Sequence, residues 1–529
     1  MPKYSIALKC DYNFDSMSSS LGNKKFVKFL LNRQPARANG GLITLVELQS
    51  NKSAQIAQSI FLQALKVENV VAYSPYFTTS NLRIFFYRNL AKIRIFSRDA
   101  LPFSIYRAMG ASQVLFVQKA TLGRSDRRKL LEKFKSSTKD EVLQFEFLGV
   151  RVGDLFYDWY LRVANKATID VEDRLCQRMF IDFLSGATFW NAFFQDVKVN
   201  NLLVTHSVYE QGVPARFAMA RDIPVFLVTS DRCFRLNKED YLSDLEFKYY
   251  VPNIEEFNGY KINLPAASKK METLFSGKIG VDIAHSFVSG LHGIETRKII
   301  RNESPIRILI AAHCFSDSPH ANGDHIFPDF IEWLKFLADY ARLSNYEWYV
   351  KAHPAFFPSD IEKFREYCAN NPHITPIDSN YSNSELVQQG INVVLTVYGT
   401  IAFEAAYLGA LVVDASANTP HMNYDFTLKP VNVSDYIGTL DNLEASLQDF
   451  KPSRSDILHF YDIHHLRKSE HWLFGDFYND MVEFMGDYSS QYTDSRIYLF
   501  WMDLAENTPH VEQVLTNIST FIADKRYVF

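Results

Sequence analysis

Cysteine is scarce in this chain, and its few cysteines are not paired along the sequence. Five occur among 529 residues, and none stands in a C-x-x-C spacing. A disulfide scaffold uses an even set of cysteines and a zinc cluster uses closely spaced ones, so both are disfavoured. The sequence therefore predicts a protein of a reducing compartment.

Long apolar runs and a surplus of positive charge are also missing. No run of ~18 uncharged apolar residues occurs, which predicts that no helix spans a membrane. The N-terminal stretch MPKYSIALKCDYNFD lacks the apolar segment of a secretory signal. The formal net charge is −4 at pH 7, so no overall positive field attracts nucleic acid. We expect a soluble, cytoplasmic protein that does not bind nucleic acid.

The first half of the chain alternates short apolar runs with helical spacing. Residues 42–48 (LITLVEL) and 70–73 are typical of β-strands, and the spacing between them predicts a helix over 54–65. Further strands are predicted at 202–205 and 225–228. A β-α-β order of this kind implies a parallel sheet with right-handed crossovers.

A second strand-helix series begins after a polar, glycine-containing stretch at 253–300. It opens with an apolar strand at 306–310, and strand-helix alternation continues to about residue 414. Beyond residue 455 the pattern turns helical and rich in aromatic residues. The sequence therefore predicts two doubly wound, Rossmann-like α/β domains and a helical C-terminal tail. Their predicted ranges are residues 1–270, 271–455 and 456–529.

The strand exit at Lys351 is the first candidate binding loop. An apolar run ends at Lys351 and is followed by His353 and Pro354. Ligands of parallel α/β sheets bind at the carboxyl ends of strands. A lysine adds a point charge, an imidazole can donate to a phosphate oxygen, and proline stiffens the loop. The alternative is a histidine that only satisfies a backbone carbonyl and a lysine that is solvated.

A second loop follows the run VVLTV. Gly399 permits close backbone approach, Thr400 can cap the following helix, and Glu404 lies one turn into that helix. Open backbone N–H groups at such a helix start suit an anion. The alternative is a plain helix cap followed by an acidic residue that complements the helix dipole.

The loop after the first strand of the second series is rich in polar side chains. His313, Ser316 and His320 are predicted to hydrogen-bond phosphate or hydroxyl oxygens of a bound ligand, or else to hold the loop together. We predict no metal site here, because the two histidines are seven residues apart and lack a tight carboxylate pair.

Carboxylates next to predicted strands and helix starts in the first half of the chain are candidates for catalysis. Glu210 follows a predicted strand and opens a helix, and Asp158 lies in the segment GDLFYDWYLR. Either can act as a general base or a nucleophile in group transfer. Asp231, after another predicted strand, is a third candidate. The alternatives are a first-turn charge for Glu210 and an ion pair with Arg162 for Asp158.

These motifs resemble a known family. The loop Lys-x-His-Pro followed by Gly-Thr-x-x-x-Glu-Ala looks like the nucleotide-binding domain of GT-B glycosyltransferases that build bacterial surface polysaccharides. Similar proteins include Kdo transferases, polysialyltransferases and teichoic-acid polyol-phosphate polymerases. The segments HCFSDSPHANGDHIFPDFIEWL, YDWYLR and THSVYEQG add to the resemblance, which covers roughly residues 150–430.

The resemblance implies two Rossmann-like domains that face each other across a cleft, the first on the acceptor side and the second binding the nucleotide-sugar. It implies a metal-independent glycosyltransferase without a cofactor, which uses a CMP-activated Kdo-like or nonulosonic acid as substrate. The acceptor would be a glycan or lipid-linked glycan of a capsule or lipopolysaccharide. A CDP-dependent polyol-phosphate transferase, a sugar-nucleotide 2-epimerase and a non-catalytic binding partner stay open as alternatives. The basic, aromatic residues 83–98 suit peripheral contact with the inner membrane or ordinary core packing.

Overall fold

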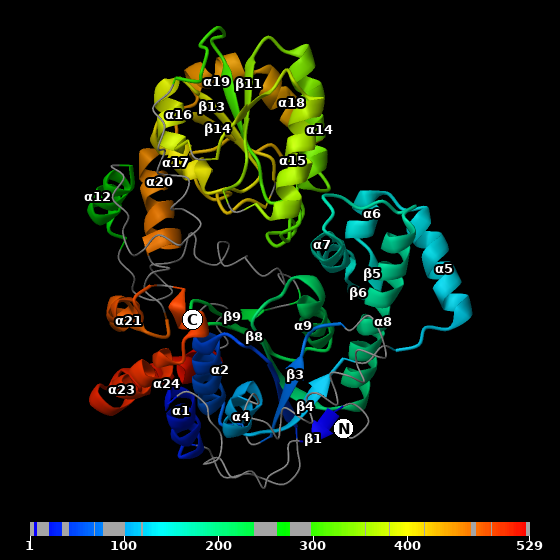
Figure 1. Ribbon diagram of the computed structural model, residues 1–529, viewed down its shortest axis with the longest axis vertical. Helices are drawn as coiled ribbons and strands as arrows, with labels where there is room; N and C mark the ends of the chain where they lie inside the picture. Colours follow the sequence, from blue (N-terminus) through cyan, green and yellow to red (C-terminus); the bar gives the residue numbers. More distant parts are fainter. Residues whose placement is uncertain are drawn as a thin grey trace. The chain divides into compact units, whose positions relative to one another are not determined.

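The computed structural model divides the chain into two compact units (Figure 1). Unit 1 comprises Met1–Phe156, Val171–Ser243 and Glu470–Phe529, and unit 2 comprises Tyr157–Asp170 and Asp244–Ser469. The structure describes residues 5–7, 21–33, 42–67, 69–77, 101–117, 120–236, 238, 262–275, 298–354, 356–379, 381–416, 418–466, 472–487 and 489–524. The basic, aromatic segment at 83–98, predicted to contact a membrane or to pack in the core, lies outside the described residues.

Unit 1 is built on a sheet that has seven strands among the described residues, in the order β1-β4-β3-β2-β7-β8-β9. The strands are β1 (Ser5–Ala7), β2 (Ile43–Glu47), β3 (Val70–Ser74), β4 (Ala111–Phe116), β7 (Val199–Val204), β8 (Val225–Val228) and β9 (Cys233–Leu236). The five inner strands are parallel, and the edge strands β1 and β9 are antiparallel to their neighbours. The chain winds from β2 toward β4 on one side and from β7 toward β8 on the other. The switch point therefore lies between β2 and β7.

Helices and a small hairpin complete unit 1. The hairpin pairs β5 (Glu146–Phe147) with β6 (Val150–Arg151). The helices are α1 (Leu21–Leu31), α2 (Lys52–Ala64), α4 (Leu101–Ala108), α5 (Arg124–Lys135), α6 (Lys139–Leu143), α8 (Arg174–Asp196), α9 (Gly212–Met219), α21 (Tyr478–Met485), α22 (Ser490–Thr493), α23 (Arg496–Asn507) and α24 (His510–Ala523). Helix α7 (Gly153–Ala164) begins in unit 1, and its residues from Tyr157 onward belong to unit 2.

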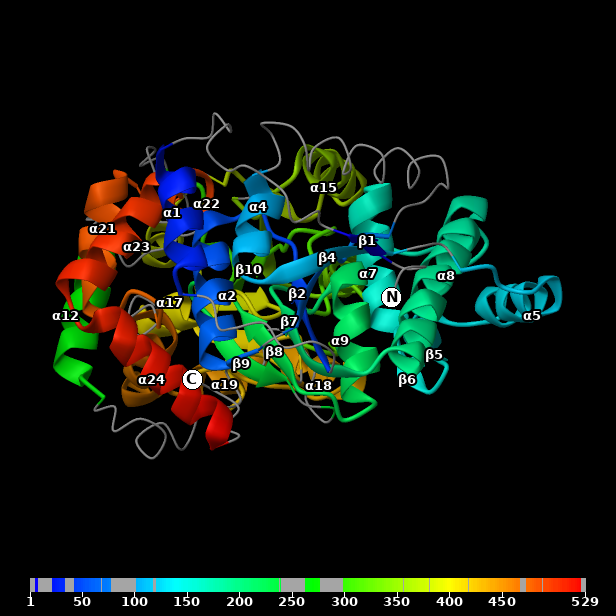
Figure 2. The same ribbon diagram turned by 90° about the horizontal axis from the view of Figure 1, so that it is seen from below.

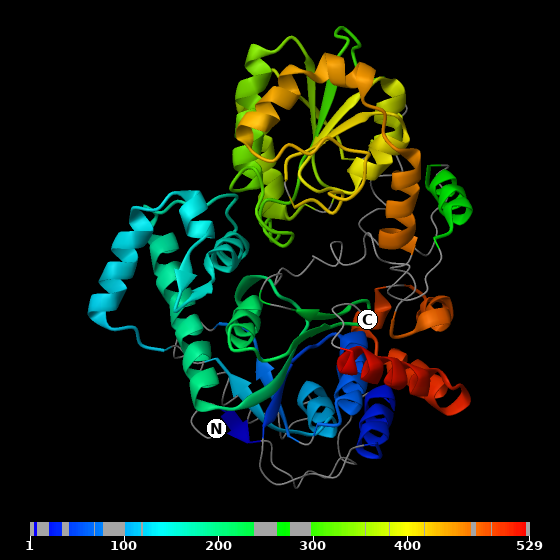
Figure 3. The ribbon, with the colours of Figure 1, turned by 180° about the vertical axis from the view of Figure 1, so that it is seen from behind.

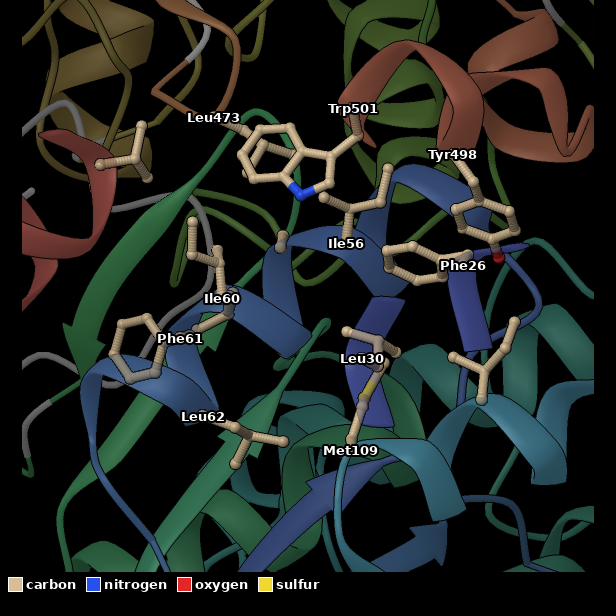
Figure 4. Close-up of a cluster of buried hydrophobic side chains, with 14 of the residues drawn as sticks. Phe26, Leu30, Ile56, Ile60, Phe61, Leu62, Met109, Leu473, Tyr498 and Trp501 are labelled. Carbon is tan, nitrogen blue, oxygen red and sulfur yellow. The ribbon is translucent and has the colours of Figure 1, made fainter. Parts of the chain in front are cut away.

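The C-terminal helices belong to the core of unit 1. Tyr498 stacks on Phe26 with ring centroids 4.3 Å apart, and Trp501 is buried in the same cluster (Figure 4). Helix α23 lies beside α1 (Figures 1 and 2). The units therefore differ from the predicted ranges, since most of the predicted tail packs within unit 1. The aromatic faces of these helices pack against apolar residues more than 400 residues earlier in the chain. Local sequence patterns do not predict such a pairing.

Unit 2 has a parallel sheet with five strands among the described residues, in the order β12-β11-β10-β13-β14. The strands are β10 (Arg307–Ala311), β11 (Glu347–Lys351), β12 (Thr375–Ile377), β13 (Val393–Thr396) and β14 (Leu411–Asp414). Winding proceeds from β10 to β12 on one side and from β13 to β14 on the other. The switch point of unit 2 lies between β10 and β13.

Helices cover both faces of this sheet (Figures 1 and 3). They are α12 (Leu264–Phe275), α14 (Phe330–Leu343), α15 (Pro358–Asn370), α16 (Asn383–Gln389), α17 (Ile401–Tyr407), α18 (Val433–Asp441), α19 (Leu443–Asp449) and α20 (Arg454–Tyr461), which runs into a π-turn, Asp462–Leu466. Successive strand side chains point to opposite faces. Ile308 and Ile310 accordingly join the core under α14, α15 and α18, while Leu309 joins the core under α16, α17 and α20. The predicted architecture of two Rossmann-like α/β domains with a helical C-terminal region is confirmed.

Candidate functional site

The switch point of unit 2 carries a cavity of about 240 Å³, here named the switch-point cavity. It lies at the carboxyl ends of β10, β11 and β13, where ligands of doubly wound sheets bind. Six residues predicted from the sequence line it: His313, Lys351, His353, Gly399, Thr400 and Glu404. Three strand exits that are 40 or more residues apart in the sequence thus meet in one place.

A buried polar chain joins Lys351 to Glu404 along one wall of the cavity. The Lys351 ammonium donates to the Tyr381 carbonyl oxygen at 2.5 Å and to Asn383 Oδ1 at 2.8 Å. Asn383 Nδ2 in turn donates to Glu404 Oε2 at 2.8 Å. Two of the three ammonium donors are thereby occupied, and one is left for a ligand. The sequence analysis missed Asn383, whose only signal was the helix start S-N-S-E, in which Ser382 is the N-cap of α16.

The pKa values of this acid and this base approach each other. Burial raises the pKa of Glu404 from 4.5 to about 7, although the Asn383 hydrogen bond and the Lys351 charge oppose the shift. Burial lowers the pKa of Lys351 from 10.5 to about 8, against the opposing charges of Glu404 and Asp378. A carboxyl group that titrates near neutral pH in a cavity can both accept and donate hydrogen bonds, which suits a hydroxyl-bearing ligand.

His313 organises the exit of β13. Its Nε2 accepts from the Val397 N–H at 3.2 Å and lies 3.0 Å from Thr396 Oγ1. Burial lowers the pKa of His313 well below its ordinary value, and the charge of His353 lowers it further. The neutral imidazole therefore fixes the loop that leads to Gly399. A Cβ at Gly399 would meet Thr396 Oγ1 at 2.8 Å, which explains the glycine.

Ser316 and His320 are buried and are not among the residues that line the cavity. The Ser316 hydroxyl donates to the Asp360 carboxylate at 3.2 Å. His320 Nδ1 lies 2.6 Å from Asp158 Oδ1, and its Nε2 lies 2.9 Å from the Pro328 carbonyl oxygen. These contacts match the alternative of a loop held together internally.

Asp158 lies in other surroundings than the sequence predicted. It was expected on the acceptor side as a catalytic carboxylate, but it belongs to unit 2, is 2% exposed, and pairs with buried His320. Arg162 does not pair with it and instead reaches Asp317 at 3.4 Å and stacks on Phe357 at 4.1 Å. Asp158 therefore acts as an anchor for α7. Thr400 also departs from expectation, since its side chain makes no cap hydrogen bond to α17.

Glu210 lies in unit 1, in a 3-10 turn (Tyr209–Gln211) that follows β7. Its neighbour Gln211 donates to buried Glu47 at 3.0 Å, and the Thr205 N–H donates to the same carboxylate at 2.7 Å. Burial raises the pKa of Glu47. Glu47 ends β2, so it marks the switch point of unit 1. The sequence analysis missed it, although a carboxylate at the end of the run LITLVEL was a readable signal.

The described residues contain no group of three or more His, Cys, Asp and Glu side chains that could hold a metal ion. Within the same part of the chain, no helix is both long and apolar enough to cross a bilayer.

No protein-family model matches the chain, and no curated protein matches it. Among solved structures, the chain is similar to UDP-GlcNAc 2-epimerase from Neisseria meningitidis bound to UDP-GlcNAc, at 11% identity and a TM-score of 0.24 over 81% of this chain and 97% of that one. It is also similar to a glycosyltransferase from Rickettsia africae, at 8% identity and a TM-score of 0.26 over 81% and 96%. The function of a fold is set by the chemistry of its site.

Proposed function

We propose that this protein is a glycosyltransferase whose nucleotide-sugar donor binds in the switch-point cavity of unit 2. The observation that carries the proposal is the convergence of Lys351, His353, Gly399 and Glu404 on one cavity at the sheet's switch point. A cation, an imidazole and a glycine-bearing turn suit a phosphate, and a buried carboxyl group suits the hydroxyls of a ribose.

Different residues of the cavity would bind different parts of the nucleotide-sugar donor. His353 and the remaining Lys351 donor would stabilise charge on the departing phosphate, without a metal ion. Glu404, oriented by Asn383, would bind the ribose hydroxyls. Glu210 of unit 1 is the proposed carboxylate for activating the acceptor hydroxyl.

The proposed donor is a CMP-activated acidic sugar of the Kdo or nonulosonic type, and the proposed acceptor is a capsule or lipopolysaccharide glycan. Both follow from the resemblance of the Lys-x-His-Pro loop to surface-polysaccharide transferases. A binding experiment tests directly which nucleotide the cavity prefers.

Thermal-shift titration of the full chain with CMP, CDP, UDP and GDP in metal-free buffer tests the donor site. A ligand that binds only the folded state raises the unfolding temperature by mass action. We expect the largest shift with CMP and its loss in His353→Ala. His459→Ala, a half-buried histidine on α20 outside the cavity, is the matched control and keeps the shift. A preference for UDP or GDP would discard the donor assignment, and no shift with any nucleotide would contradict the proposed function.

A further inference from the structure

Cys314 lies beside Nδ1 of the His353 ring. It follows His313 in the loop after β10, is 9% exposed, and does not line the switch-point cavity. Its Sγ is 3.4 Å from His353 Nδ1. His353 itself lines the cavity, so the Nδ1 edge of the ring faces a thiol of the protein interior. Nε2 is the ring nitrogen on the other edge.

The backbone under His353 is fixed separately from its ring. The Phe356 N–H donates to the His353 carbonyl oxygen at 3.2 Å, and Pro354 restricts the backbone of the preceding residue, His353. The Phe356 ring stacks at 6.4 Å from the imidazole. These contacts place the residue but leave the choice of tautomer to the groups around Nδ1 and Nε2, among which Cys314 is the near neighbour of Nδ1.

Burial favours the neutral form of both partners. Burial, and next the charges of Asp317 and Asp360, raise the pKa of the Cys314 thiol to about 12. Burial also lowers the pKa of His353 below 6.5, with Asp317 opposing and Lys351 adding to the shift. A protonated thiol is a weak donor and a weaker acceptor, so the pairing that suits both groups is S–H to Nδ1. The imidazole proton then resides on Nε2.

We propose that Cys314 is a positioning residue for His353: its S–H donates to Nδ1, holds the ring, and fixes the tautomer that presents Nε2–H to an anionic oxygen in the switch-point cavity. That the oxygen belongs to a nucleotide phosphate rests on the proposed function. The tautomer itself does not depend on it.

The tautomer is measured by ¹⁵N NMR on the full chain labelled at histidine, with the His353 signals assigned by their loss in His353→Ala. In the wild type we expect a protonated Nε2 and an unprotonated Nδ1. Cys314→Ala should give averaged shifts, because Nδ1 loses its donor. Cys314→Ser should restore part of the wild-type pattern, since its hydroxyl can donate from slightly farther away. Cys368→Ala, a half-buried cysteine of α15 outside the cavity, is the control and should leave the spectrum unchanged.

Nucleotide affinity is measured on the same variants, with CMP as the probe. Loss of the hydrogen bond that orients the His353 ring should weaken CMP binding roughly 3- to 10-fold in Cys314→Ala and less in Cys314→Ser. Cys368→Ala should leave the CMP affinity unchanged. A proton on Nδ1 in the wild type, or an unchanged His353 spectrum in Cys314→Ala, would overturn the proposal. So would altered shifts with unaltered CMP affinity. If no nucleotide binds even to the wild type while the Nε2–H tautomer is found, the proposed function fails and the Cys314–His353 pairing stands.

Discussion

Glu404 is the residue whose protonation state bears most directly on the candidate site. Its folded-state pKa of about 7 lies above the ordinary value of 4.5. The native protein therefore binds more protons than the unfolded chain between these pH values, so the free energy of unfolding falls as pH rises through this window.

Glu404→Gln keeps the acceptor for Asn383 but cannot titrate. Relative to wild type, we expect the variant to gain stability between pH 4.5 and 7, by up to about 3 kcal/mol, with little difference at pH 4.5. Lys351 stays protonated in this range because its pKa is about 8. Unfolding midpoints of both proteins across the range provide the measurement. Parallel pH profiles would show that Glu404 ionises normally in the folded state.

Gly399 offers a second test at the residue scale. A methyl group there meets Thr396 Oγ1, which itself accepts from the Gly399 N–H at 3.0 Å. Gly399→Ala should therefore displace the turn and weaken nucleotide binding about tenfold, while the apolar core around the sheet keeps the fold. Gly438→Ala is the control, because a Cβ there meets nothing within 4 Å. Equal nucleotide affinities in the two variants would show that the turn at Gly399 is not part of the binding site.

Elements were predicted best where the sequence pattern is local. The strand predicted at residues 42–48 is β2, the helix at 54–65 is α2, and the strand at 306–310 is β10 within one residue. Lys351 ends one of the strands that the apolar runs predicted, and the loops with His353 and Gly399 follow such strands. They meet because the strand exits of a parallel sheet share one edge.

Pairings between distant segments were not predictable from such patterns. The antiparallel edge strands β1 and β9 owe their places to long-range hydrogen bonds. Asp158 was interpreted with its i+4 neighbour Arg162, but its partner is 162 residues away on the loop after β10. The i+4 rule compares only residues of the same helix, so it cannot predict a buried partner from another element.

Asp158 anchors α7, and this role predicts a loss of stability. Asp158→Ala removes both carboxylate oxygens that contact the His320 ring and the His320 N–H, so we expect unit 2 to lose about 3–5 kcal/mol. Lys335→Gln, which breaks the exposed pair with Glu332 on α14, should cost less than about 1 kcal/mol. Chemical denaturation compares the two. If Asp158→Ala were as stable as wild type but inactive in sugar transfer, the result would contradict the anchoring role and support a catalytic one.

At the scale of the whole molecule, each unit has a hydrophobic core of its own. Trp501 is buried in the core of unit 1 together with Phe26 and Tyr498, while Trp333 is buried in unit 2 and donates to the Tyr436 hydroxyl at 3.1 Å. A chain with two cores need not unfold in one step. A nucleotide bound in unit 2 should therefore stabilise the two units unequally.

Trp501→Ala and Trp333→Ala form a matched pair that tests this division. Each removes a side chain that is 1% exposed and should destabilise its own unit by about 3–5 kcal/mol. We expect two calorimetric unfolding transitions. Trp501→Ala should lower the midpoint temperature of the transition that nucleotide does not shift. Trp333→Ala should lower the midpoint temperature of the transition that nucleotide raises. A single transition that moves with both substitutions and with nucleotide would mean that the two cores unfold together. The C-terminal helices would then support the nucleotide site as well, because Trp501 lies on α23, and their deletion would abolish binding rather than spare it.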